Sequence, residues 1–320
     1  MPDGDESIAR PRSVFQAELP APCNAAWDWH ARPGAFERLV PPFDPVRLVS
    51  SSGTIEEGDS KVLAVPPLGL RWVARHGRAV RGALFVDRQE RGPFASFVHH
   101  HRFTPLTSES CLLSDELDWR LPLEPASRWL AGGFVRSKLA RMFAWRHHVV
   151  VHDLAMARAL AIAPLHLDLA CMSRARAQVA AFIDTQGHVI VAQGGRTTPA
   201  PSIDARLRLA DGLLVVEPRR GGTIQLHCGD LVLDRRDLRR GGAWTLLEDL
   251  VAAALLAAAG RLADGPHSLV RHECQLASTP LAPLVLDGIE LPLRWRSMAE
   301  LEARLGGRVR AGDPRPDPTA

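Results

Sequence analysis

The chain of 320 residues contains no tyrosine and only two lysines, Lys61 and Lys138. A phenol therefore cannot serve as an acid or base anywhere in this protein, and no lysine amine exists after residue 138. No hydrophobic run reaches the roughly 18 uninterrupted residues that a transmembrane helix needs. The nearest run, LVAAALLAAAG from Leu250, is too short. The sequence therefore predicts no membrane span.

Other signals are weak or missing. The five cysteines are scattered, odd in number and without CxxC spacing, which disfavours both a disulfide framework and a zinc finger. The net charge of +3 gives no electrostatic case for binding nucleic acid. The first eleven residues, MPDGDESIARP, are polar and acidic, and no apolar stretch of a secretory signal follows them. We expect a cytoplasmic protein without a nucleic-acid partner.

Aromatic residues divide the chain. Of the ten Phe and eight Trp residues, all but Phe182, Trp244 and Trp295 precede residue 150, and the second half is rich in Ala, Leu, Arg and Gly instead. Pro164 interrupts a helical pattern between the two halves. We expect one domain at 12–160, a second at 166–306 and a disordered tail at 307–320, which ends in the Pro- and Asp-rich stretch AGDPRPDPTA.

The first domain reads as a sheet followed by a long helix. A strand-like segment, SVFQAEL, and two short helical segments precede six extended runs with turn-like separators, at 46–51, 61–66, 70–80, 83–92, 95–105 and 111–121. This spacing is typical of an antiparallel meander. After Pro125, apolar residues recur every three to five positions, which predicts an amphipathic helix of up to ~35 residues. The order is that of an α+β helix-grip fold, in which a curved antiparallel sheet wraps a long C-terminal helix and leaves a cavity.

Four segments carry a family resemblance: APCNAAWDWHARPGAFERLVPPFDPVRLV, RWVARH, FVDRQERGPFASFVHHHRF and LLSDELDWRLPL. They resemble the SRPBCC superfamily (START-like, polyketide cyclase/dehydrase-like) over about residues 12–157. More narrowly, they resemble the branch in which such a domain precedes an epimerase-like domain. The resemblance implies that a hydrophobic small molecule binds in the cavity, and that some members are cyclases.

Strand alternation selects candidate residues for that cavity, because every second side chain shares a face. His99, His101 and Asp115 are polar groups on otherwise apolar strand faces. The residues predicted to line the cavity are Trp72, His76, Phe85, Asp87, Gln89, Phe97, His99, His101, Phe103, Asp115, Trp119 and Phe134.

The inward His and Asp residues allow three interpretations. They contact the ligand, they perform acid–base catalysis, or they hydrogen-bond one another and stabilise the sheet. A metal ion shared by His99 and His101 would need a third ligand, such as Asp115 or Asp87, and we expect no metal site. His147 and His148, with His152 one turn later, are interpreted as a solvated helix face.

The second domain resembles the NAD-dependent epimerase/dehydratase family of the extended short-chain-dehydrogenase type. LDLA and ARAQVAAFIDTQGHVIVAQGGR resemble its first strand, first helix and second strand, and GLLVVEP at 212–218 predicts a buried strand of a small parallel sheet. The helix LLEDLVAAALLAAAG is apolar nearly all round and should be buried. We expect a reduced α/β Rossmann-like domain over 166–306.

The second domain departs from that family at the residues that bind the cofactor and at those that catalyse the reaction. A dinucleotide fingerprint needs glycines for its tight turn and for the approach of the pyrophosphate, but the loop reads CMSRARA at 171–177. The family's Tyr-x-x-x-Lys pair is also absent, since the chain has no Tyr and no Lys after Lys138. We therefore expect no cofactor and a second domain that is not catalytic.

The sequence thus favours binding of a hydrophobic small molecule by the first domain. One alternative is an NAD(P)-dependent epimerase or reductase. Another is a cyclase or dehydratase that uses His99, His101 or Asp115 in the first domain. A third is a scaffold whose second domain forms a homodimer.

Overall fold

The computed structural model describes residues 12–41, 46–56, 58, 60–65, 70–171, 176–193, 203–210, 213–227, 242–261, 265–268, 284–286 and 289–291. The expected tail at 307–320 lies outside the described residues, as do four of the seven residues of the CMSRARA segment. Among the helices that are described, none is long and apolar enough to cross a membrane.

The chain forms two compact units. Of the described residues, the first unit contains those up to Ala31 and those from 46 to Val151. The second contains 32–41 and the residues from His152 onward. The two units therefore interlace along the sequence, because a short segment that precedes most strands of the first unit belongs to the second.

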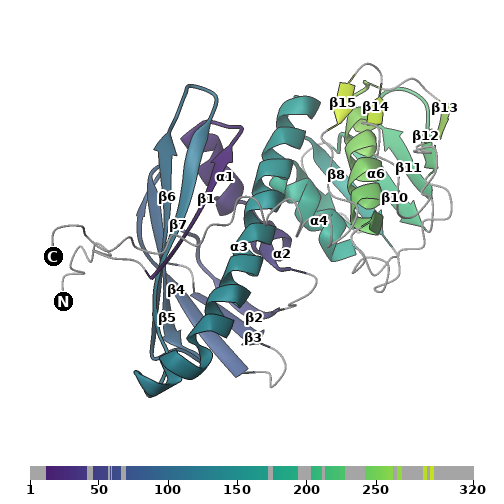
Figure 1. Ribbon diagram of the computed structural model, residues 1–320. Coiled ribbons are helices and arrows are strands. Elements are labelled where there is room, and N and C mark those ends of the chain that lie inside the picture. The colour runs from purple at the N-terminus through teal and green to yellow at the C-terminus, as the bar shows by residue number, and fades with distance from the viewer. Residues whose placement is uncertain are drawn as a thin grey trace, which may run out of the picture. The chain divides into compact units, whose positions relative to one another are not determined.

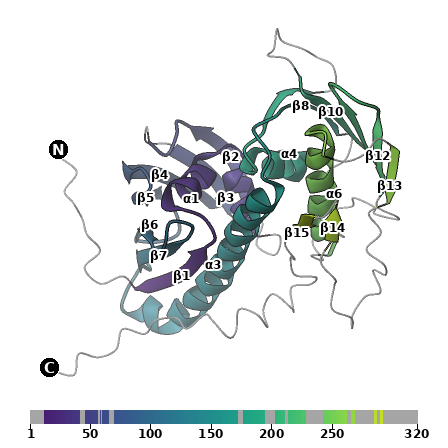
Figure 2. The same ribbon diagram turned by 90° about the horizontal axis from the view of Figure 1, so that it is seen from above.

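The first unit contains a seven-stranded antiparallel sheet in the order β1-β7-β6-β5-β4-β3-β2. Figure 2 shows the sheet curving around α1 and the first part of α3. This confirms the expected α+β fold with a large antiparallel sheet and a long helix. The elements are β1 (Ser13–Leu19), α1 (Cys23–Ala31), β2 (Arg47–Ser52), β3 (Ser60–Val65), β4 (Leu70–Val80), β5 (Leu84–Arg91), β6 (Ser96–Pro105), β7 (Cys111–Arg120) and α3 (Ala126–Leu160), of which α3 continues into the second unit after Val151.

The second unit contains a six-stranded mixed sheet in the order β13-β12-β11-β10-β8-β9. Figure 1 labels its strands and helices. Its elements are α2 (Ala35–Leu39), β8 (His166–Cys171), α4 (Arg176–Thr185), β9 (Val189–Ala192), β10 (Ala205–Ala210), β11 (Leu213–Pro218), β12 (Ile224–His227), α6 (Gly242–Ala258) and β13 (Gly265–Ser268), with a separate hairpin of β14 (Leu284–Leu286) and β15 (Ile289–Leu291).

Strand direction in this sheet differs in part from the expectation. β8, α4 and β9 form the expected parallel β-α-β unit, and β10 is parallel to β8. β11, the GLLVVEP strand, is antiparallel to both of its neighbours, and its side chains alternate in burial. The expected parallel strands are present as β9, β8 and β10, but GLLVVEP is not one of them, because the short connection from β10 to β11 allows only an antiparallel hairpin.

The core of the second unit forms around α6. Each residue from Leu250 to Ala257 is at most 1% exposed, as the apolar sequence predicted. These residues pack with side chains of α4 and of strands β8 and β10 to β12. The described part of α6 is thus buried by other elements of the same unit.

The short helix α2 packs against α4 in the second unit. Gly34, which precedes α2, adopts a positive φ of 79° and approaches α4 so closely that a Cβ there would lie 2.7 Å from Ala181 Cα. Glycine meets both demands, because it tolerates positive φ and has no Cβ.

A buried ion cluster ties α2 to two other helices of this unit. The Arg38 guanidinium donates from Nε to Asp153 Oδ2 at 2.9 Å, from Nη2 to Asp153 Oδ1, and from Nη1 to Glu248 Oε1 at 2.5 Å. Asp153 also accepts a hydrogen bond from the Thr185 hydroxyl at 3.2 Å. Burial works to raise the pKa of Asp153, but the charges and hydrogen bonds of Arg38 and His152 together outweigh burial and hold that pKa below its ordinary value.

His188 makes the second unit sensitive to acid. Its Nδ1 accepts the backbone N–H of Leu165 at 3.2 Å, which requires an unprotonated Nδ1. Burial, with help from the Arg32 charge, lowers the pKa of His188 to about 4. Below pH ~6.5 the unfolded chain binds a proton here that the folded chain does not, so stability is complete above that pH and falls as the pH drops toward 4.

We expect His188→Gln to flatten this dependence, because an amide oxygen accepts the same N–H without titrating. In urea unfolding of the second unit, the wild type should lose about 1.4 kcal/mol more per pH unit than the variant between pH 6 and 4.5. Parallel slopes for the two proteins would show that His188 does not carry the effect.

Candidate functional site

The register of four strands, β4 to β7, gathers the polar candidates on one face of the first unit's sheet. Residues directly opposite each other in antiparallel strands share a face. Asp87 of β5 lies opposite His99 of β6, and His101 of β6 lies opposite Asp115 of β7. His76 of β4 lies opposite Asp87, beside a β-bulge. The arrangement follows from two-residue alternation in β6, where His100 points to the other face.

Asp115 is the centre of this polar cluster. One of its oxygens, Oδ1, lies 2.8 Å from His99 Nε2 and 2.7 Å from His101 Nδ1, while Oδ2 lies 2.5 Å from His147 Nε2. The His101 contact is short but lies off the direction of a hydrogen bond. Burial works to raise the pKa of Asp115, yet the positive charge and the hydrogen bonds of these histidines hold that pKa well below its ordinary value.

Asp87 forms a second carboxylate centre. Its Oδ1 lies 2.5 Å from His76 Nδ1, and its Oδ2 lies 3.2 Å from His101 Nε2 and 4.0 Å from His99 Nδ1. Burial opposes ionisation here as well, but His76 and His101 lower the pKa of Asp87 well below its usual range. His101 therefore bridges two ionised carboxylates.

The two central histidines differ in their affinity for a proton. Burial, together with the charge of the neighbouring His101, lowers the pKa of His99 to about 4. Burial also disfavours protonated His101, but Asp115 and Asp87 outweigh burial, so the pKa of His101 is raised. The rings are tilted against each other with centroids 3.8 Å apart. The two neighbouring imidazoles thus differ in proton affinity, with His101 the more basic of the two, an arrangement able to donate or accept a proton.

An aromatic cluster adjoins the polar one. Phe15 and Phe143 stack with ring centroids 4.7 Å apart, and the Phe143 ring meets the His99 ring edge-on at 5.1 Å. Phe97, Trp119, Leu117 and Leu139 complete the buried core of this cluster. Its outer boundary is only partly buried and consists of Trp72, Phe94, Leu121, Val135, Ala140 and Met142. The sheet and α3 thus present partly buried apolar side chains next to buried titratable groups.

Three further residues predicted to line the cavity, Phe85, Phe103 and Gln89, contact protein groups near the two clusters. Phe85 stacks on His101 with centroids 3.9 Å apart, and Phe103 packs with it near α1. The Gln89 side chain binds the backbone of Phe94: its Nε2 donates to the Phe94 carbonyl oxygen at 2.8 Å, and its Oε1 accepts from the Phe94 N–H at 3.3 Å. Whether these residues contact a ligand stays a prediction.

Phe134 is not brought to the cluster. Its side chain is 72% exposed, and Trp129 and Leu130 on the same part of α3 are exposed as well. The physical reason is helical geometry: Phe134 precedes Leu139 by five residues, which places it about 140° around the helix from that buried side chain. Phe134 thus lies outside the buried cluster, and its contact with a ligand stays a prediction.

Sequence reasoning also misplaced the histidines of α3. His147 and His152 are buried, so the solvated helix face expected for them is wrong. His147 contacts Asp115 in the first unit, and His152 Nδ1 lies 3.5 Å from Asp153 in the second. The available signal was the four-residue spacing of Leu139, Phe143 and His147, which places them on one side of the helix.

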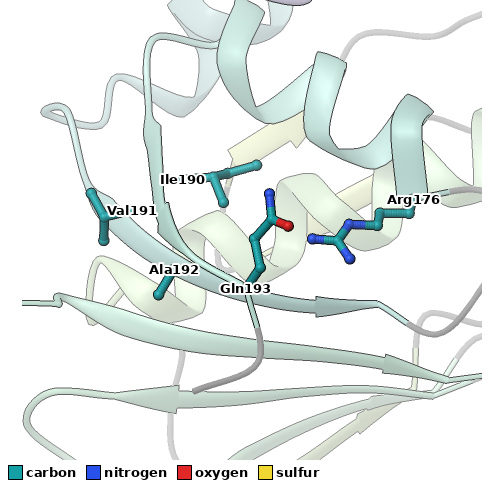
Figure 3. Close-up of a pocket in the computed structure, with 5 residues that line it drawn as sticks. All are labelled: Arg176, Ile190, Val191, Ala192 and Gln193. Carbon is teal, nitrogen blue, oxygen red and sulfur yellow. The ribbon is translucent and has the colours of Figure 1, made fainter. Parts of the chain in front are cut away.

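A pocket of about 520 Å³ lies in the second unit, where β9 ends and α4 begins. In Figure 3 the side chains of Arg176 and Gln193 extend toward each other across this pocket, and Ile190, Val191 and Ala192 form its wall. Arg176 and Gln193 are the polar residues of the lining, and Arg176 supplies a positive charge.

Comparisons with known proteins bear on the first unit. Residues 19–145 match a family model described as polyketide cyclase / dehydrase and lipid transport. This segment is therefore a domain of the polyketide cyclase/dehydrase type. No curated protein matches the chain.

Several solved structures are similar. A nucleoside-diphosphate sugar epimerase from Corynebacterium glutamicum is 26% identical, with a TM-score of 0.47, over 80% of this chain and 53% of its own. The chain thus spans about half the length of that protein. The Zhui aromatase/cyclase from Streptomyces sp. R1128 is 17% identical, with a TM-score of 0.36, over 44% of this chain and 91% of its own. A START superfamily protein from Mycobacterium smegmatis is 16% identical, with a TM-score of 0.31, over 41% and 92%.

Proposed function

We propose that the first unit binds a hydrophobic small molecule against the inner face of its sheet. The observation that carries this proposal is the partly buried apolar boundary around the Phe15–Phe143 cluster, which includes Trp72 and Phe94. A ligand that covers these side chains gains the free energy of removing apolar surface from water, about 25 cal/mol per Å². The matching family description supports the proposal, because polyketide and lipid molecules are largely apolar.

The adjoining polar cluster would orient such a ligand. Small-molecule sites combine a mainly apolar lining with a few placed polar groups. His99 links the two parts, since its ring contacts Phe143 on one side and Asp115 on the other. A ligand carbonyl or hydroxyl group near this ring would find both hydrogen-bond donors and acceptors. The same groups would serve a cyclase or dehydratase reaction by moving a proton, which is the second candidate function.

The second unit is proposed to be a non-catalytic, Rossmann-like relative of epimerase domains. Its chain supplies no tyrosine and no lysine, so the acid–base pair of that family has no counterpart in it. Support for a structural role comes from the buried Arg38 cluster and the buried α6, which serve packing. The pocket beside Arg176 is the observation that favours the alternative, binding of a nucleotide cofactor.

Displacement of a fluorescent apolar dye from the full chain tests the ligand proposal. The wild type should bind the dye saturably, and Trp72→Ala should weaken binding about tenfold or more, because truncation removes a large apolar contact. Trp129→Ala is the matched control, since Trp129 lies outside the aromatic cluster and is exposed. Equal effects of the two substitutions, or no saturable binding by the wild type, would refute the proposed site.

A further inference from the structure

We propose that Asp87, His99 and His101 bind a divalent transition-metal ion, with zinc as the probe. One ligand atom from each residue lies within 4.8 Å of the other two. Two imidazoles and a carboxylate are donors that zinc and related first-row ions accept. This inference does not depend on the proposed binding of a hydrophobic molecule.

Distances between the facing atoms suit a shared ion. Asp87 Oδ2 lies 3.2 Å from His101 Nε2 and 4.0 Å from His99 Nδ1. Zinc bonds of about 2.0–2.1 Å in tetrahedral geometry place neighbouring ligand atoms roughly 3.3 Å apart. The three atoms therefore need only small side-chain rotations to surround one ion, which then lies between strands β5 and β6.

Asp115 prepares both histidines for this role. It contacts the ring nitrogens that face away from Asp87, His99 Nε2 at 2.8 Å and His101 Nδ1 at 2.7 Å. A proton held on His99 Nε2 and donated to Asp115 leaves the lone pair of His99 Nδ1 facing Asp87. His101 Nε2 is hydrogen-bonded to Asp87 in the ion-free protein, and it would bind the ion after giving up that shared proton, while its Nδ1 stays beside Asp115. Metal-binding histidines usually donate their second N–H to a carboxylate in this way, which fixes the tautomer and the ring orientation.

The two carboxylates are held in place from outside the ligand set. His76 contacts Asp87 through Oδ1 and leaves Oδ2 facing the histidines. His147 contacts Asp115 through Oδ2 and leaves Oδ1 for His99 and His101. In each carboxylate, one oxygen contacts an outer histidine, His76 or His147, and the other faces His99 and His101. Three protein ligands leave a further coordination position for water or for an oxygen of a bound molecule.

Metal analysis of the full, untagged chain tests this proposal. After chelator treatment and dialysis, titration with Co²⁺ should give one bound ion per chain and the visible absorption bands of a low-symmetry cobalt site, and Zn²⁺ should displace it. His99→Ala and Asp87→Asn should each weaken binding by more than a hundredfold. Asp115→Asn should weaken it 10- to 100-fold while one ion still binds.

His100→Ala is the matched control, because His100 belongs to the same histidine run but lies on the opposite sheet face, beside Arg102. It should leave affinity unchanged. Equal loss in His100→Ala and His99→Ala would mean that the run binds metal adventitiously, and no cobalt bands in the wild type would overturn the site. Anomalous diffraction at the zinc edge from wild-type crystals decides the matter without variants: a peak among Asp87, His99 and His101 is expected, and its absence there contradicts the proposal.

Discussion

Replacement of Arg38 by methionine is expected to lower the free energy of unfolding of the second unit by about 3–5 kcal/mol. The substitution leaves Asp153 and Glu248, both buried, without the guanidinium that compensates their charges. Two uncompensated carboxylates in an apolar interior must either take up protons or admit water, and both cost stability. Urea unfolding monitored by circular dichroism measures the loss.

Two further sets of substitutions test whether the loss comes from the unpaired buried charges. Arg75→Met removes an exposed pair with Glu90 at 3.1 Å and should change stability by less than about 1 kcal/mol. Adding Asp153→Leu and Glu248→Leu to Arg38→Met should restore much of the loss, because no charge then stays unpaired. An Arg38 variant as stable as the Arg75 variant would show that the buried cluster does not hold α2 in the second unit.

Replacement of Asp115 by alanine is expected to destabilise the first unit by about 3 kcal/mol or more at pH 7. Three histidines contact this carboxylate, and His101 would then depend on Asp87 alone for compensation of its charge. Because the folded protein holds the pKa of Asp115 below its ordinary value, the stabilisation is present above about pH 4 and is lost as the pH falls through the folded pKa. The difference between wild type and variant should therefore shrink in acid.

Asp118→Ala is the control on the same strand. Asp118 lies on the opposite face of β7, is partly exposed and is 3.7 Å from Arg12, so its removal should cost less than about 1 kcal/mol. The pKa of His101, followed by NMR, should fall in Asp115→Ala and stay unchanged in Asp118→Ala. An unchanged His101 pKa in both variants would contradict the role assigned to Asp115.

Much of the first unit's sheet could be predicted from the sequence, because its strands obey a period of two and are joined by short turns. The same period put His99 and His101 on one face and His100 on the other. Sequence alone does not give the register between strands, which depends on turn lengths and bulges. The irregularity between His76 and Ala79, which places His76 opposite Asp87, encloses Gly77. A glycine inside a strand is a signal for a bulge, but it does not give the register that results.

The features that sequence reasoning missed depend on contacts between distant segments. Nothing in residues 32–41 indicates that Arg38 would meet carboxylates 115 and 210 positions away. His147 looked like a surface residue because a histidine pair on a helix is usually solvated, and its partner Asp115 lies on another element. Phe134 is exposed although it follows the approximate helical spacing, because a five-residue step to Leu139 moves it off the buried face of α3.

Parallel titrations of the full-length protein with an apolar fluorescent dye and with NADH and NADPH test the central claim most directly. If the first unit is the ligand-binding domain and the second does not hold a cofactor, the dye should bind saturably and nicotinamide fluorescence should not change. Saturable micromolar binding of NADH or NADPH, with no binding of the dye, would contradict this account and would identify the pocket beside Arg176 as the first place to look for the cofactor.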